Sequence, residues 1–138
     1  MTVLGVAGGL LVLAAGAMHL WLYFDYFHTV HVVGILFLVN AAAALVIAVA
    51  LVLTRAGWAL AGGIAYSVGT LAAFLVSVYH GLFGYVERLT GTWQLAAGAA
   101  EVAALIVLLA AMAGQFPQSV ARRRTYRRLR QAEPRRQQ

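Results

Sequence analysis

Residues 31–53 read HVVGILFLVNAAAALVIAVALVL, an apolar run that contains no Asp, Glu, Lys or Arg. At about 1.5 Å per residue, a helix of this length crosses the roughly 30 Å hydrocarbon core of a bilayer. The whole chain shares this character, since 63% of its 138 residues are hydrophobic, 10% are charged and its mean hydropathy is +0.85. Such values lie far outside the composition of soluble proteins. The stretch therefore predicts a membrane-spanning helix in an integral membrane protein.

Three further apolar runs flank this one, so the sequence predicts an all-α transmembrane four-helix bundle. The spans are expected at about residues 3–24, 31–53, 58–83 and 93–113. The breaks between them are short, and short connections make consecutive helices antiparallel, which gives an up-down bundle. Residues 1–116 are expected to form this transmembrane domain, and residues 117–138 a basic C-terminal tail.

The placement of arginine predicts the direction of the spans. Residues 122–136 contain eight arginines and one glutamate, whereas formal charges are rare before residue 122. Because basic residues stay on the cytoplasmic side, both termini are expected to be cytoplasmic. The chain is then a multi-pass protein of a bacterial inner membrane, with its tail arginines against anionic lipid headgroups. Nucleic-acid binding is not expected, since Tyr126 is the only aromatic residue among these arginines.

Polar side chains in the outward halves of the spans are the best indication of a functional site. By helix rise, His19 and His80 are expected roughly 8 Å inside the outer boundary, and Asn40 and Glu101 roughly 13 Å. Ser77 is expected on the same helical face as His80. Two imidazoles facing each other suit haem or part of a metal site, and a buried glutamate must be protonated or paired. We therefore predict a pocket of these five residues, with His19, His80 and Glu101 as candidate metal ligands.

A second candidate metal set lies around the first connection. Asp25, His28 and His31 are spaced three apart, so they would share one face if the helix continued through them. The same residues can equally form a hydrated polar loop. With no cysteine in the chain, nitrogen and oxygen ligands favour copper(II), zinc or iron. The ligand therefore stays open among a metal ion, haem and a quinone.

Two interpretations of function follow from these residues. The first is a small redox-linked membrane component that binds a metal, haem or quinone in an outward-facing His/Glu pocket. The alternative is a structural or assembly accessory subunit of a larger membrane complex, in which the polar residues only connect helices. A proton-coupled transporter is disfavoured, because Glu101 is the only acid deep in a span. No catalytic triad or nucleotide-binding motif is visible, so enzymatic activity and homo-oligomer formation both stay open.

Several runs of this chain resemble those of small four-span integral membrane proteins of actinobacteria. The runs are His19-Leu-Trp-Leu-Tyr, Gly34-Ile-Leu-Phe-Leu-Val-Asn40, Gly69-Thr-Leu, Gly81-Leu-Phe-Gly-Tyr-Val-Glu87 and Glu101-Val-Ala-Ala. The resemblance covers all four spans and implies a membrane location rather than an activity. In size and span count the chain is also similar to the DoxX-like proteins, some of which are quinone-linked accessory subunits. No functional residue is carried over from them.

Overall fold

The computed structural model describes residues 3–54, 56–88 and 91–115, which form four long helices. These are α1 (Val3–Asp25), α2 (His31–Leu53), α3 (Gly57–Tyr79) and α4 (Thr92–Ala113), with a short 3-10 helix, η1 (Phe27–Thr29), between α1 and α2. Each long helix is long and apolar enough to cross a membrane. The predicted all-α class is therefore confirmed, and the chain has the fold of a small multi-pass membrane protein. The predicted tail at 117–138 lies outside the described residues.

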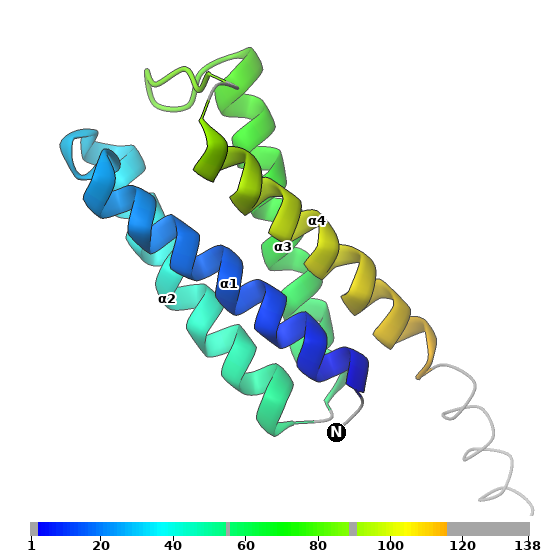
Figure 1. Cartoon of the computed structure of the whole chain (residues 1–138). Helices are drawn as coiled ribbons and strands as arrows, with labels where there is room; N and C mark the ends of the chain where they lie inside the picture. Colours follow the sequence, from blue (N-terminus) through cyan, green and yellow to red (C-terminus); the bar gives the residue numbers. More distant parts are fainter. Residues whose placement is uncertain (1–2, 55, 89–90, 116–138) are drawn as a thin grey trace, which may run out of the picture.

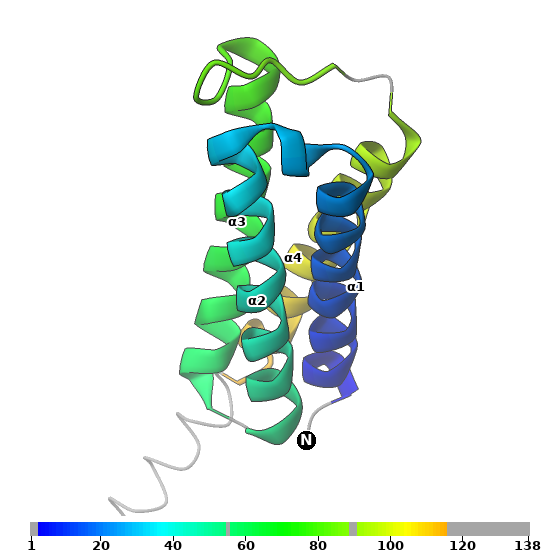
Figure 2. The ribbon, with the colours of Figure 1, turned by 90° about the vertical axis from the view of Figure 1, so that its left-hand side faces the viewer.

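Consecutive helices run antiparallel and pack side by side (Figure 1). α1 packs most closely against α2 and α4, and α3 packs against α4, whereas α2 and α3 contact each other less. The α1–α2 and α3–α4 connections lie at one end of the bundle, which we call the His28 end (Figure 2). The α2–α3 connection lies at the opposite end, the Thr54 end. The order around the bundle is therefore α1, α2, α3, α4, with α1 and α3 diagonal to each other.

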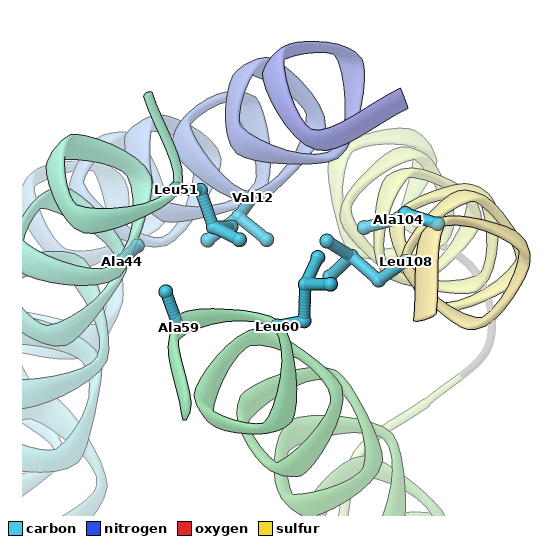
Figure 3. Close-up of a cluster of buried hydrophobic side chains, with 8 residues drawn as sticks. Val12, Ala44, Leu51, Ala59, Leu60, Ala104 and Leu108 are labelled. Carbon is cyan, nitrogen blue, oxygen red and sulfur yellow. The ribbon is translucent and has the colours of Figure 1, made fainter. Parts of the chain in front are cut away.

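The half of the bundle toward the Thr54 end is closely packed and apolar. Figure 3 shows its core, whose buried residues are Val12, Ala44, Leu51, Ala59, Leu60, Ala104, Leu108 and Ala111. Small residues let the helices approach here: a Cβ added at Gly8 would lie 2.5 Å from the Cδ2 of Leu108. Because lipid is as apolar as these side chains, close van der Waals contact is what holds the helices together.

Aromatic packing closes the His28 end of the pair formed by α1 and α2. Phe27 of η1 is completely buried, together with Leu22 and Val33. Its ring stacks on Phe37 with a centroid separation of 4.1 Å and an interplanar angle of 20°. The ring of Tyr85, from the α3–α4 connection, meets Phe27 edge-on at 5.3 Å. The two connections at this end are therefore joined through the ring of Phe27.

α3 ends at Tyr79, so the predicted span through Phe83 is too long. The backbone after it enters the left-handed region, with φ angles of +80° at Gly81, +50° at Phe83 and +83° at Gly84. A right-handed helix cannot continue through such residues. The N–H of Leu82 donates to the carbonyl of Tyr85 at 2.7 Å, and the N–H of Tyr85 donates back to Leu82 at 2.9 Å, which closes a tight turn.

Candidate functional site

A cavity of about 320 Å³ lies between α2 and α3, in the half of the bundle toward the His28 end. Its walls are mainly apolar and include the rings of Phe27, Phe37 and Phe74. Val39 of α2 and Gly69 of α3 line it and are exposed, so it opens on the side of the bundle. The polar residues in its lining are His19, Asn40, Tyr66, Thr70, Ser77 and Glu87. Pockets of this volume and character hold small organic ligands in other proteins.

Three polar residues of α3 share one face of the helix and point their hydroxyl-bearing side chains to this cavity. Tyr66, Thr70 and Ser77 follow one another at helical spacing. The hydroxyl of Thr70 donates to the backbone carbonyl of Tyr66 at 3.0 Å and to that of Ser67 at 3.1 Å. The hydroxyl of Ser77 donates to the carbonyl of Tyr85 at 3.4 Å. The protons of both aliphatic hydroxyls are therefore used within the protein.

Two polar atoms on the cavity wall are buried without a hydrogen-bond partner. They are the Oδ1 of Asn40 and the phenolic oxygen of Tyr66, and the partners were sought among the residues that the structure describes. Leaving a buried polar atom unpaired costs about 1–3 kcal/mol, so native structures rarely keep one without a purpose. Asn40 and Tyr66 therefore each present a polar atom to the cavity that is free to form a hydrogen bond.

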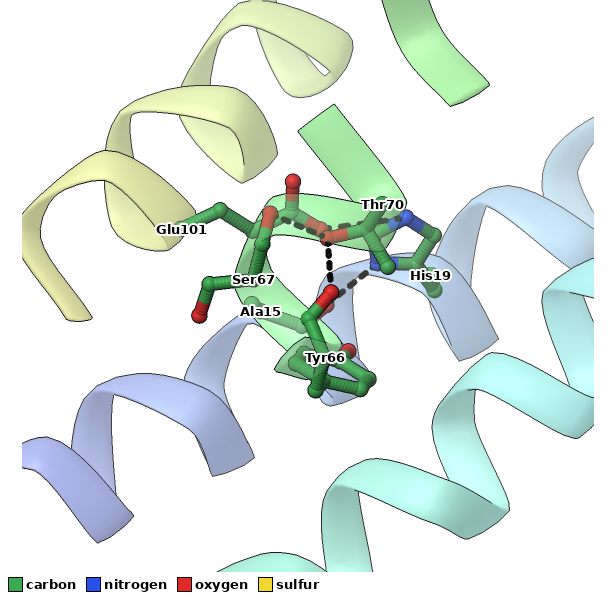
Figure 4. A network of polar contacts seen from close by, with 6 residues as sticks. All are labelled: Ala15, His19, Tyr66, Ser67, Thr70 and Glu101. Atoms are coloured by element: carbon green, nitrogen blue, oxygen red, sulfur yellow. Dashed lines mark hydrogen bonds and ion pairs between the residues drawn. The ribbon is translucent and has the colours of Figure 1, made fainter. Parts of the chain in front are cut away.

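His19 of α1 and Glu101 of α4 are brought together behind the cavity (Figure 4). The Nε2 of His19 lies 3.6 Å from the Oε1 of Glu101, and the side chain of Glu101 is 3% exposed. The Nδ1–H of His19 donates to the carbonyl of Ala15 at 2.8 Å. A carbonyl only accepts, so Nδ1 carries a proton. Nε2 faces the carboxyl group at ion-pair distance, and Oε1 has no hydrogen-bond partner among the described residues. Both nitrogens of His19 are thereby engaged, and its ring packs on Phe37 at 5.1 Å.

His19 is the side chain near Glu101 that can supply a positive charge. Ser67 is completely buried, and it lies with Tyr66 and Thr70 of α3 around the carboxyl group (Figure 4). Within the described residues, Arg88 is the only lysine or arginine, and it belongs to the α3–α4 connection outside the helices. A charged carboxylate in a membrane helix needs a cation, which only an imidazole can supply here. The pair therefore links α1 to α4 inside the bundle.

His80 does not join this pair. It is exposed, follows the last residue of α3 and is not part of the cavity lining. Since α3 ends at Tyr79, His80 belongs to the connection, and its side chain is exposed there. Among the described residues, no three His, Asp or Glu side chains gather closely enough to hold a metal ion. The primary metal set stays a prediction from sequence, with His19 and Glu101 paired and His80 elsewhere.

The second candidate set is spread along the first connection. Asp25, His28 and His31 are all exposed. The Nδ1 of His28 lies 3.2 Å from the carbonyl of Tyr23, to which it donates. α1 ends at Asp25 and α2 begins at His31, so residues spaced three apart do not share the face of one continuous helix. The three residues therefore lie on an exposed connection, and both the metal set and the hydrated polar loop stay predictions from sequence.

Four further residues of the site were outside the predicted set. Tyr66 and Thr70 line the cavity, and their +4 spacing on the face of Ser77 was the signal that could have included them. Tyr85 and Glu87 also line it, although both lie beyond the helix in the connection. The N–H of Glu87 donates to the carbonyl of Ser77 at 3.1 Å, which folds the connection back onto α3. No local sequence pattern predicts this hydrogen bond between Glu87 and Ser77.

Glu87 is a largely buried carboxyl group at the His28 end of the cavity, with 8% of its surface exposed. Burial raises the pKa of Glu87 above its usual range, and the backbone N–H of Arg88, which donates to its Oε1 at 3.0 Å, lowers it in part. Burial and the neighbouring Glu87 raise the pKa of Tyr85 to about 12. The cavity therefore has a carboxyl group at this end that holds its proton more firmly than a free one.

Glu87→Gln is expected to stabilise the protein modestly near neutral pH. Because the pKa of Glu87 is higher in the folded than in the unfolded chain, stability is greatest below the unfolded value and falls as pH rises through the folded one. The glutamine variant has no charge to bury and should lose this fall. Thermal unfolding in detergent from about pH 4 to about pH 8 measures the difference. Identical pH profiles for the two proteins would contradict the expectation.

The arrangement as a whole is a mainly apolar cavity in the side of a helix bundle. Aromatic and aliphatic walls cover most of it, a few polar atoms stand at fixed positions, and a buried His–Glu pair supports one wall. The chain matches no family model, no curated protein and no solved structure in comparisons with known proteins.

Proposed function

We propose that the chain binds a lipophilic molecule with a planar, oxygen-bearing ring, of the quinone class, in the cavity between α2 and α3. The observation that carries this proposal is the presence of two unpartnered buried polar atoms, on Asn40 and Tyr66, in a wall that is otherwise apolar and aromatic. A ring of this class has flat faces that aromatic side chains cover. Its edge oxygens accept hydrogen bonds as carbonyls and donate them as hydroxyls in the reduced form, so they can pair with the amide of Asn40 and the phenol of Tyr66. Ring and wall are therefore complementary.

The position of the opening supports a ligand that arrives from the lipid. Val39 and Gly69 line the cavity and are exposed on the side of the bundle, the surface that membrane-spanning helices turn toward hydrocarbon. A molecule dissolved in the bilayer would reach the cavity without crossing water, and a long apolar tail would stay in the lipid. A soluble metabolite has no such route.

The donor geometry favours a quinone over the metal and haem alternatives. Six-coordinate haem needs two imidazoles with free nitrogens. Both nitrogens of His19 are engaged, and His80 is exposed outside the cavity. A metal ion needs three or four well-placed ligands, and the described residues form no such group.

We extend the proposal to the location of the site. The arginine distribution supports an inner-membrane protein with the His28 end, and with it the cavity, on the outer side. A redox-linked component would then meet its quinone in the outer half of the bilayer. The second candidate function is an accessory subunit of a larger complex, and the exposed apolar helix faces suit it, since membrane partners pack against such surfaces as lipid does.

Calorimetric titration of the purified protein in detergent with short-chain benzoquinones and naphthoquinones tests the proposal. Saturable binding is expected, and Asn40→Leu should weaken it by about tenfold, which corresponds to about 1.4 kcal/mol, because the side chain keeps its size and loses its hydrogen bond. Gln94→Leu is the matched control, since Gln94 is an amide in α4 outside the cavity. Absence of saturable binding, or equal binding by Asn40→Leu, would overturn the proposal in favour of the accessory subunit.

A further inference from the structure

The polar atoms that face the cavity differ in what they can still offer a ligand. A hydroxyl whose proton is already donated to the protein keeps only its lone pairs for a ligand, and it acts there as an acceptor. Thr70 and Ser77 are in this state, since their protons go to carbonyls of α3 and of the α3–α4 connection. These two positions can accept a hydrogen bond from a ligand and cannot donate one without giving up an existing bond.

Asn40 and Glu87 add further acceptors. The Oδ1 of Asn40 is the buried atom of its amide that has no partner, and a carbonyl oxygen only accepts. Glu87 receives the N–H of Arg88 at Oε1, and its carboxyl group keeps further lone pairs in either protonation state. Both residues line the cavity. Acceptors therefore occur along its whole length, from Asn40 to Glu87.

Donors into the cavity are few. The Nδ1 of His19 is hydrogen-bonded to the carbonyl of Ala15, and its Nε2 faces Glu101. The ring therefore presents its flat face to the cavity and no N–H group. Tyr66 has a phenolic O–H without a partner, and it can donate or accept. The other donors are the amide nitrogen of Asn40 and the phenolic O–H of Tyr85, which also lines the cavity. A ligand that brings its own O–H groups would therefore satisfy more of the wall than a ligand that brings only carbonyl oxygens.

We propose that the cavity selects the reduced form of its ligand, a quinol, over the oxidised quinone. This inference rests on the proposed function. It follows from the excess of hydrogen-bond acceptors, because a quinol presents two O–H donors where the quinone presents two acceptors. A buried site built to pair with a hydroxyl discriminates strongly against an analogue without it, since its polar atoms are then left unpaired. The site is therefore specific for the reduced state of its ligand as well as for a planar ring.

A set of three probes with one ring and one short side chain tests the selection: a naphthoquinol, the corresponding naphthoquinone and the dimethyl ether of the quinol. The dimethyl ether keeps both oxygens and has no O–H to donate. We expect the full-length protein in detergent, under anaerobic conditions, to bind the quinol at least about tenfold more tightly than either other probe. The same preference raises the reduction potential of the bound two-electron couple by about 30 mV for each tenfold difference.

The variant Thr70→Val adds a readout on one acceptor, because it replaces the hydroxyl with a methyl group of similar size. It should lower the ratio of quinol affinity to quinone affinity, because it removes an acceptor that only the quinol can use. Thr54→Val, at the opposite end of the bundle and outside the cavity, is the control. Equal binding of quinol and quinone, or tighter binding of the quinone, overturns the inference and leaves the proposed function standing. If none of the three probes binds, the proposed function fails and this inference fails with it.

Discussion

Gly69→Leu is expected to weaken ligand binding strongly while the bundle keeps its fold. Gly69 lines the cavity, and an added Cβ there would meet no atom within 4 Å, so the leucine side chain can occupy the space that the ligand needs. Affinity for a short-chain quinone should fall by at least about tenfold, which corresponds to about 1.4 kcal/mol. Stability should stay level or rise, because leucine is favoured over glycine in a helix by up to about 0.8 kcal/mol. Calorimetric titration and thermal unfolding of the same preparation measure both effects.

Gly62→Leu is the matched control for this substitution. Gly62 lies two turns earlier on α3, it also has no atom within 4 Å of an added Cβ, and it is not part of the cavity lining. The control should share any gain in stability and bind the quinone as the parent protein does. If Gly69→Leu binds as tightly as Gly62→Leu, the ligand does not occupy this cavity.

Gly16→Leu is expected to destabilise the bundle strongly. A Cβ added at Gly16 would collide with the Cβ of Ala44, and the backbone of Ala41 lies 3.6 Å away at its carbonyl oxygen. These atoms belong to the body of α2 and cannot rotate aside, so α1 and α2 must separate to admit a larger side chain. Overpacking typically costs about 1–3 kcal/mol, and the upper end of that range is expected for four added carbon atoms between closely packed helices.

Gly98→Leu provides the comparison for this second prediction. Gly98 lies in the second turn of α4, and an added Cβ there meets no atom within 4 Å. Its leucine variant should unfold at the same or a slightly higher temperature than the parent protein. Unfolding of both variants in a series of mixed micelles with rising denaturing detergent gives the free-energy difference. Equal stability of Gly16→Leu and Gly98→Leu would show that the close contact between α1 and α2 is not needed.

The buried pair formed by His19 and Glu101 connects these two parts of the molecule. It joins α1, which packs tightly on α2 at Gly16, to α4, and its imidazole forms part of the cavity wall. Because each partner would be costly to leave unpaired in the bundle, the ring of His19 is held against Phe37 in one orientation. The pair therefore has a clear structural role in shaping the cavity.

The number and nature of the helices follow from the amino-acid sequence alone. In lipid every backbone polar group must be satisfied within its own segment, so a long apolar run has no alternative to a helix. The expected spans beginning at residues 3, 31, 58 and 93 agree with the observed helices to within one residue at those ends. Only the end of the third helix was misjudged, because the left-handed turn at Gly81, Phe83 and Gly84 is as apolar as the helix before it.

The sequence also indicated how far along their helices His19, Asn40 and Glu101 lie, because position follows from helical rise alone, whereas His80, expected inside a span, follows the end of α3. It did not determine which of them meet. Glu101 pairs with His19 and not with His80, since His80 lies beyond the end of α3 on an exposed connection. That outcome depends on where one helix stops and how two others are rotated, and neither is a property of any single segment.

The location of the cavity depends on how the helices pack in three dimensions. α1 approaches α2 closely through glycine and alanine, whereas α2 and α3 remain further apart along the face that carries Tyr66 and Thr70. Glu87 enters the site through one backbone hydrogen bond to Ser77, which brings a connection back over the end of a helix. Apolar composition places every helix in the bilayer but does not decide which helices pack together. That depends on how closely their small residues let the backbones approach.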